Sequence, residues 1–217
     1  MKKIIIVVFL LNVSGVFAQN KLRLGVHLDP ISTWFSPKTK GIEKDGARLG
    51  ISGGLLMEYY FSQNYGLASG ISITGLGGNL MYNDSLYISA GGENVLVKGG
   101  STVAYNVTYL TIPLALKLKT NEMGFFTYFA KLGLNHHINI GSKASSSGSE
   151  LSKDNVSEEI NLFNLSYFFG GGLEYNLGGQ TSLSFGLFYN HGFTDVLSND
   201  DHKANLNCLV FHVGMFF

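Results

Sequence analysis

Residues 208–217 read CLVFHVGMFF, and apolar side chains occupy every second position of this C-terminal stretch. One face of the alternation carries Leu209, Phe211, Val213, Met215 and Phe217. The opposite face carries Cys208, Val210, His212, Gly214 and Phe216. A period of two residues is typical of a β-strand. The chain is therefore predicted to end in a strand with one uninterrupted apolar face.

The same alternation recurs along the chain. The other predicted strands cover residues 22–28, 48–61, 65–75, 103–119, 125–140, 162–177 and 182–190. In two places apolar residues change phase, at Tyr105 to Tyr109 and at Leu76 and Leu80. There we expect a bulge, or aromatic side chains that fill the lumen near the loop ends. Together with the last strand, the pattern predicts an all-β protein of eight strands.

The predicted connections alternate between short and long. Tight turns are expected at 63–64, 121–124 and 178–180, and long polar loops at 29–45, 82–102, 141–160 and 194–204. Short periplasmic turns and long external loops are typical of outer-membrane barrels. Because a bilayer tolerates no unpaired backbone groups in its core, strands that span it must close into a barrel. We therefore predict an eight-stranded antiparallel transmembrane up-and-down β-barrel in the cell outer membrane, with outer-membrane lipid around it.

The first residues have the pattern of an export signal. Lys2 and Lys3 precede an apolar run at 4–11, and Val16-Phe17-Ala18 provides small residues for cleavage. We predict a signal peptide at 1–18 and a barrel domain at 19–217. A soluble periplasmic barrel is the alternative, but the non-apolar face of the strands is rich in Gly, Ser and Ala and poor in the Lys and Glu of soluble surfaces.

The composition excludes several classes of function. The 217 residues include 15 basic and 15 acidic side chains, 28 glycines and one cysteine. A balanced charge gives no basic face for nucleic acid. One cysteine excludes a disulfide scaffold and a site built from several thiolates. We expect no cofactor and no nucleic-acid partner.

Several segments resemble a known family. They are Tyr109-Leu110-Thr111-Ile112-Pro113-Leu114 leading to Lys117, the Gly-rich segments ending in Glu58-Tyr59 and Glu174-Tyr175, and the terminal Phe217. The mature chain resembles the porin-family, PorT-like outer-membrane β-barrel domain, and more distantly the small OmpA- and OmpX-type barrels. The C-terminal pattern of Phe211, Val213, Met215 and Phe217 also resembles the signal read by the barrel-assembly machinery. The resemblance thus implies that this machinery is a partner during biogenesis.

Charged residues fall on the predicted lumen face near the short turns. They are Arg23, Glu58, Lys117, Lys119, Lys131, Glu174 and His212. Charges in a narrow interior need partners, and eight strands leave room for little more than side chains. We expect these residues to form a plug of ion pairs; a gate whose pairs exchange to admit ions is the alternative.

No catalytic motif is present. His136, His137 and His191, with Ser142 and Ser198, could suggest an enzyme of the outer rim, but no G-x-S-x-G or H-E-x-x-H pattern accompanies them. We therefore expect no catalytic, cofactor or metal residues. The expected role is structural, or an interaction with a protein partner at the long loops. A narrow gated pore and an accessory subunit of a secretion or assembly complex remain alternatives, and a lipid-modifying rim enzyme is a more remote one.

Overall fold

The computed structural model describes residues 22–147, 151–199 and 201–217, so the predicted signal peptide lies outside the described residues. The strands are β1 Leu22–Pro37, β2 Ile42–Lys44, β3 Arg48–Tyr60, β4 Tyr65–Tyr82, β5 Leu86–Ala90, β6 Glu93–Val97, β7 Ser101–Lys119, β8 Phe126–Ser146, β9 Ser152–Asn155, β10 Phe163–Gly178, β11 Thr181–Gly192 and β12 Ala204–Phe216. A 3₁₀ turn, η2, covers Ser157–Glu159. None of the described helical segments is long and apolar enough to cross a membrane.

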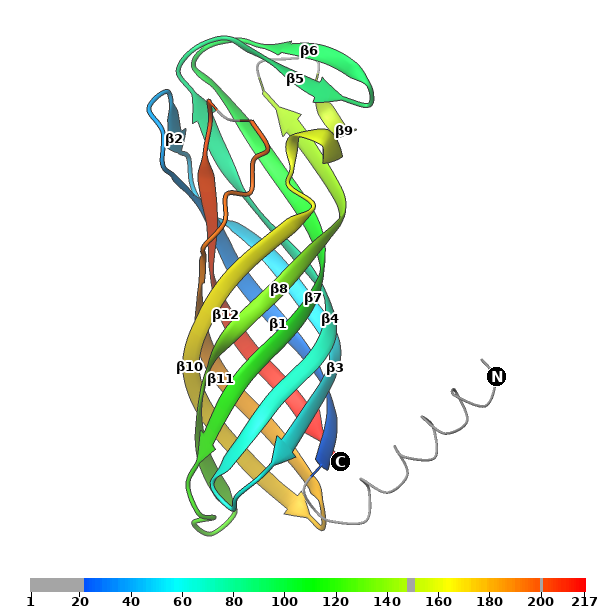
Figure 1. Ribbon diagram of the computed structural model, residues 1–217, viewed down its shortest axis with the longest axis vertical. Coiled ribbons are helices and arrows are strands. Elements are labelled where there is room, and N and C mark those ends of the chain that lie inside the picture. Colours follow the sequence, from blue (N-terminus) through cyan, green and yellow to red (C-terminus); the bar gives the residue numbers. More distant parts are fainter. Residues whose placement is uncertain (1–21, 148–150, 200) are drawn as a thin grey trace, which may run out of the picture.

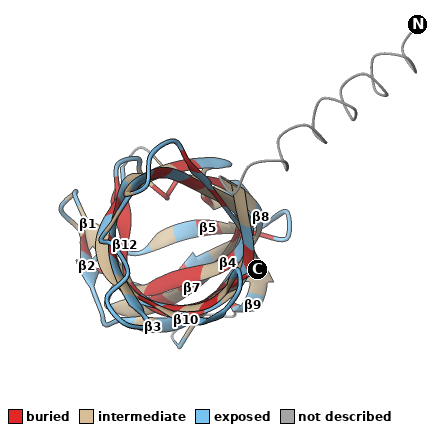
Figure 2. Cartoon of the chain, turned by 90° about the horizontal axis from the view of Figure 1, so that it is seen from below, coloured by how far each residue is buried: buried red, intermediate tan, exposed pale blue. Residues whose placement is uncertain are grey.

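Eight of the strands close into an antiparallel barrel, which confirms the predicted fold. Around the barrel their order is β1, β3, β4, β7, β8, β10, β11 and β12. Pairing of β12 with β1 closes the ring, and all the pairings are antiparallel. Figure 1 shows the tight turns and the C-terminus at one end and the long connections at the other, and Figure 2 shows the closed ring along its axis.

Apolar side chains cover the outside of the barrel. Leu55, Ile73 and Leu132 are 59%, 57% and 61% exposed, as expected for residues that face lipid. Aromatic side chains beside the short turns, among them Tyr65 and Tyr128, also lie on the outside, and Tyr175 contacts the rings of Phe125 and Phe126. This arrangement reverses that of a soluble barrel, whose apolar face lies inside.

The first long loop was wrongly predicted. Residues 29–37 continue β1, because Pro30 is accommodated where the ladder to β12 is interrupted between the pairs His27–Gly214 and Ile31–Val210. There the Val213 N–H donates to the Asp29 side chain at 3.1 Å. Proline lacks an N–H, and this gap in the ladder removes the need for one.

Pro113 is accommodated in the same way within β7. The ladder to β4 is interrupted between the pairs Ser69–Leu114 and Ser72–Thr111. The Ser69 hydroxyl donates to the Pro113 carbonyl at 2.8 Å. A central strand can therefore carry proline when a side chain satisfies the freed backbone group.

The other long connections contain more strand than predicted. The 82–102 segment holds the hairpin of β5 and β6, and β8 extends to Ser146 and pairs with β9. At both predicted phase changes the apolar side chains point into the lumen, where Leu76 and Leu80 of β4 are also buried. Tyr105 and Tyr109 point into the lumen in step with Lys117, so they are the aromatic filling that we considered. The bulge lies instead on β8, where the register with β7 shifts between Thr108 and Tyr109.

The extracellular half of the lumen is filled by apolar side chains. This upper apolar core includes Phe35, Leu80, Val103, Tyr105 and Leu206, each less than a tenth exposed. The rings of Phe35 and Tyr105 meet edge to face with centroids 5.8 Å apart. Polar and charged side chains dominate only below this core, so the lumen has two chemically distinct halves.

Candidate functional site

The periplasmic half of the lumen contains a lower ionic cluster, which consists of Arg23, Glu58, Lys117, Lys131 and Glu174. Lys117 lies at its centre and is fully buried. Its Nζ donates to Glu58 Oε2 at 2.7 Å and to Glu58 Oε1 at 2.8 Å, and it also contacts Glu174 Oε1. Lys117 therefore joins the two buried carboxylates, which extend from strands on different sides of the barrel.

Arg23 and Lys131 complete the lower ionic cluster. Arg23 Nη1 donates to Glu174 Oε2 at 2.8 Å, and Lys131 Nζ lies 3.0 Å from Glu58 Oε1. The Arg23 guanidinium also lies over the Phe216 ring, 4.6 Å from its centroid. The cations are thus held by carboxylates and by an aromatic face, which supplies the pairing that a low-dielectric interior demands.

The other two residues of the predicted lumen group lie elsewhere. Lys119 is half-buried and its Nζ lies 4.1 Å from the centre of the Tyr60 ring, toward the periplasmic mouth. His212 lies in the lumen with Asp29 as its partner, at 2.9 Å between Nδ1 and Oδ1. The structure therefore brings five of the seven residues into one cluster.

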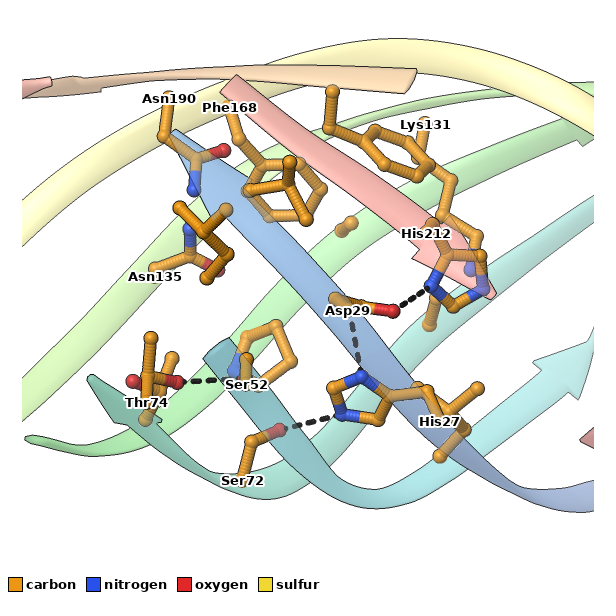
Figure 3. A pocket seen from close by; sticks show the side chains of 18 of the residues that line it. His27, Asp29, Ser52, Ser72, Thr74, Lys131, Asn135, Phe168, Asn190 and His212 are labelled. Atoms are coloured by element: carbon orange, nitrogen blue, oxygen red, sulfur yellow. Dashed lines mark hydrogen bonds and ion pairs between the residues drawn. The ribbon is translucent and has the colours of Figure 1, made fainter. Parts of the chain in front are cut away.

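A cavity of about 120 Å³ lies in the lumen beside the lower ionic cluster (Figure 3). Its polar lining includes His27, Asp29, Ser72, Asn135 and His212. Apolar residues such as Phe168 and Val210 complete the wall. Among the lining residues Asp29 is the sole carboxylate, so the cavity has one negative group with imidazoles beside it.

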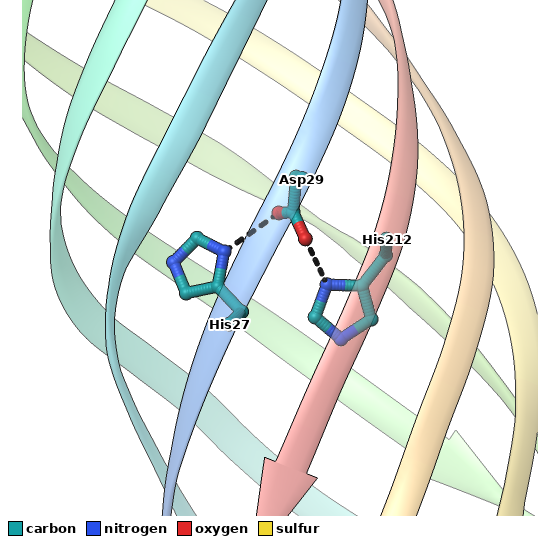
Figure 4. A group of neighbouring side chains, drawn as sticks. All are labelled: His27, Asp29 and His212. Carbon is teal, nitrogen blue, oxygen red and sulfur yellow. Dashed lines mark hydrogen bonds and ion pairs between the residues drawn. The ribbon is translucent and has the colours of Figure 1, made fainter.

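His27, Asp29 and His212 form a compact group, which we call the His-Asp-His cluster (Figure 4). His27 Nδ1 lies 2.7 Å from Asp29 Oδ2, and His212 Nδ1 lies 2.9 Å from Asp29 Oδ1. One ligand atom from each residue can be chosen so that all lie within 4.8 Å of one another. Two imidazoles and a carboxylate are also a familiar ligand set for transition metals.

Glycines make room for the two imidazole rings. His27 pairs with Gly54 on one side and with Gly214 on the other. A Cβ atom at Gly54 would lie 2.1 Å from the Ile71 carbonyl oxygen, and one at Gly214 would lie 3.0 Å from His212 Nε2. Because these positions lack side chains, the His27 ring reaches across β3 to Ser72, whose Oγ lies 2.9 Å from Nε2.

Sequence reasoning missed Asp29 and did not single out His27. Asp29 fell in the predicted first loop, and His27, within the strand predicted at 22–28, was given no role. Continuing the period of two past Pro30 would have found them, since Arg23, His27, Asp29, Ile31 and Phe35 all point inward. The proline concealed this pattern.

The histidines considered for a rim enzyme lie apart from the serines considered with them. His137 is buried in the lumen between the hydroxyls of Thr111 and Ser166, at 2.9 and 3.0 Å. His136 lies on the outside beside the Ile112 carbonyl, and the His191 ring contacts Tyr167 and Tyr189. Ser142 bonds Asn139, and Ser198 donates to the Glu158 carbonyl. The described contacts thus assemble no serine–histidine pair at the rim.

The C-terminal strand presents its apolar face outward. Phe211, Val213 and Phe217 are 48%, 44% and 51% exposed, and Met215 is half-buried. The Phe217 N–H donates to the Leu24 carbonyl at 2.9 Å, which extends the closing contact with β1. Recognition of this strand by assembly machinery stays a prediction.

Cys208 points into the lumen and is 3% exposed. The Asn190 side chain lies 3.3 Å from its Sγ. This placement is that of a small buried side chain packed in the barrel wall.

Several solved outer-membrane protein structures are similar to this chain at low sequence identity. Neisserial surface protein A is 13% identical, with a TM-score of 0.50 over 89% of this chain and 95% of that chain. The Ail protein of Yersinia pestis is 15% identical with a TM-score of 0.45, over 91% and 98% of the two chains. OprG of Pseudomonas aeruginosa is 11% identical with a TM-score of 0.47, over 91% and 97%. At such identities the likeness to neisserial surface protein A shows a shared fold.

Among curated proteins no significant match is found. The family model described as outer membrane protein beta-barrel domain matches residues 17–198. The narrower PorT-like resemblance stays a prediction. Since the matched region covers most of the closed barrel, the chain belongs to the outer membrane protein β-barrel domain family and is located in the cell outer membrane.

Proposed function

We propose that this protein serves the outer membrane as a closed barrel that presents an ordered external rim to a protein partner, without catalysing a reaction or conducting ions. The observation that carries the proposal is the filling of the lumen. The lower ionic cluster occupies its periplasmic half and the upper apolar core its extracellular half. A barrel sealed in both halves is suited to display rather than to transport.

The external connections support the display role because they are packed together. The hairpin of β5 and β6 contacts the η2 segment, where the Ser89 N–H and Oγ donate to the Glu159 and Glu158 carboxylates at 2.8 and 2.6 Å. Ile88, Val97 and Val156 are buried beneath this contact. Tyr87 and Leu96 remain 65% and 45% exposed on the same hairpin. Ordered loops with exposed apolar side chains provide a preformed contact surface.

The absence of catalysis is proposed although one hydrogen-bonded chain resembles a catalytic triad. Ser72 Oγ, His27 and Asp29 follow one another at 2.9 and 2.7 Å, the order of a Ser-His-Asp triad. Such a triad also needs N–H donors for an oxyanion. His27 pairs with Gly54 and Gly214, and Ser72 pairs with Gly54 and Thr111, so both residues stand within strand ladders. The nearby Val213 N–H, which has left its ladder, already donates to the Asp29 carboxylate.

The sealed lumen predicts that the purified barrel gives no stepwise ion conductance in planar lipid bilayers. For ions to pass through the lumen, the ion pairs of the lower ionic cluster and the side chains of the upper apolar core would have to move apart at the same time. Single-channel recording of the wild type and of Glu174→Gln, with a porin as positive control, tests this. Conductance steps in the wild type whose size changes in Glu174→Gln would favour the gated pore instead.

The rim predicts a partner contact at the β5–β6 hairpin. A photo-reactive phenylalanine analogue in place of Tyr87 should form a defined protein adduct when intact cells are irradiated. The matched control is the same analogue at Asn121, which is exposed in a periplasmic turn. Adducts at position 121 alone would contradict display at the rim and favour the accessory subunit of an assembly complex.

A further inference from the structure

We propose that the His-Asp-His cluster is a binding site for one divalent transition-metal ion of the Zn²⁺ type, with a free coordination position facing the lumen cavity. The site goes beyond the proposed display role. The reason for it is the convergence of His27, Asp29 and His212 on one point of the barrel interior. Imidazole and carboxylate groups are ligands that suit zinc and its neighbours.

The distances suit a shared ion. Zinc lies about 2.0–2.2 Å from nitrogen and oxygen ligands, so two ligands of one tetrahedral ion are about 3.4 Å apart. The nitrogen–oxygen separations are 2.7 and 2.9 Å, so each pair would open by roughly 0.5 to 0.7 Å around an ion. Because all three ligand atoms already lie within 4.8 Å of one another, the widest pair would close by at most about 1.4 Å. Both histidines turn Nδ1 toward the carboxylate, so one ion can replace the two protons now shared with it.

The neighbouring groups hold these ligands in place. If His27 ligates through Nδ1, its Nε2 carries the proton and donates to Ser72 Oγ, 2.9 Å away. The Val213 N–H fixes Asp29 Oδ1 at 3.1 Å. Metal ligands are usually oriented by such secondary hydrogen bonds. The polar hydroxyls of Ser52, Ser72 and Thr74 line the same cavity and can receive a metal-bound water.

The described hydrogen bonding of the His212 ring is confined to its Nδ1 side. His212 is 5% exposed, and within the described part of the chain its Nε2 is buried without a hydrogen-bond partner. Buried polar groups in a structural network are normally all paired, and an unpaired one costs about 1–3 kcal/mol. The His212 ring is therefore oriented so that Nδ1 contacts Asp29, and this orientation leaves Nε2 unpaired.

The local charge also permits a cation. Lys131 lines the cavity, but its ammonium is engaged by Glu58 at 3.0 Å. Asp29 and the uncharged lining hydroxyls contribute no further positive charge. A divalent ion would thus meet one carboxylate directly, and the lysine that lines the cavity is already paired.

The test uses the untagged barrel refolded in detergent with Zn²⁺ or Co²⁺ present, because the lumen is closed in the folded state. After dialysis, elemental analysis should find one equivalent of metal, and Co²⁺ should show visible absorption typical of nitrogen and oxygen ligation. His27→Asn, Asp29→Asn and His212→Asn should each weaken binding by about 100-fold or more in competition with a chelator. His136→Asn, on the outer face, should bind as the wild type does.

Heat-modifiable gel migration shows which variants have folded, and only folded samples are compared. Absence of retained metal in the wild type, or retention by a folded His27→Asn/His212→Asn double variant, overturns the site. X-ray absorption of the wild-type Co²⁺ or Zn²⁺ sample needs no variant. Two imidazoles with oxygen ligands support the site, whereas an all-oxygen shell or four imidazoles overturns it.

Discussion

Replacing Glu58 by glutamine should lower the free energy of unfolding of the barrel by about 3 to 5 kcal/mol. Glu58 is 1% exposed and faces Lys117 and Lys131 within 3.0 Å. Glutamine preserves the shape of the side chain, so the change removes the charge that both buried ammonium groups need. Unfolding by urea in detergent, followed by the fluorescence of the single tryptophan, Trp34, measures the loss.

Two further variants separate the effect of burial from the effect of charge. Glu93→Gln, at an exposed position of the β5–β6 hairpin, should change stability by less than about 0.5 kcal/mol. Lys131→Met combined with Glu58→Gln should be less destabilised than Glu58→Gln alone, because one unpaired cation is then absent. Equal losses for Glu93→Gln and Glu58→Gln would show that the lower ionic cluster contributes nothing specific.

Arginine in place of Leu55 should destabilise the barrel by about 2 to 4 kcal/mol in a lipid bilayer. Leu55 is 59% exposed on the outside of β3, beside the outward-facing Ile71 of β4, and both lie in the middle of their strands. At this depth the guanidinium would have to leave water for hydrocarbon. Equilibrium unfolding from phospholipid vesicles gives the free-energy difference.

The control for this change lies on the external hairpin. Leu96 is also exposed and apolar, at 45%, but it belongs to β6 beyond the barrel wall. Leu96→Arg should therefore alter stability by less than about 0.5 kcal/mol. A similar loss at both positions would mean that lipid does not surround Leu55, and the assigned apolar band would be wrong.

The period of two residues was sufficient to predict eight strands, because barrel strands must alternate between lipid and lumen. It also placed Lys117 and Glu174 on the inner face. It failed next to Pro30: the first strand was predicted to end at residue 28, although the Asp29 carboxylate accepts from the Val213 N–H that lacks a ladder partner and the strand continues. At Tyr105 it left a bulge and a lumen-filling aromatic side chain as alternatives, because alternation distinguishes apolar from polar and not inside from outside.

Partnerships across the lumen could not be derived from the sequence. Arg23 bonds Glu174, and Asp29 bonds His212, at sequence separations of 151 and 183 residues. Periodicity gives the face of each strand but not the height at which side chains from opposite walls meet. Those heights depend on strand tilt and register, which are set by the closed geometry as a whole.

The closure of β12 against β1 has a consequence for how the barrel assembles in the membrane. Arg23 and Asp29 enter with the first strand, whereas their partners Glu174 and His212 lie on β10 and β12 and are synthesised much later. A sheet in which only some strands have paired would carry unpaired charged side chains into the hydrocarbon core and would also expose an unpaired strand edge. Partly inserted intermediates are therefore unfavourable for two reasons at the junction of β1 and β12. This favours a chain that stays at the membrane surface until its final strand is available.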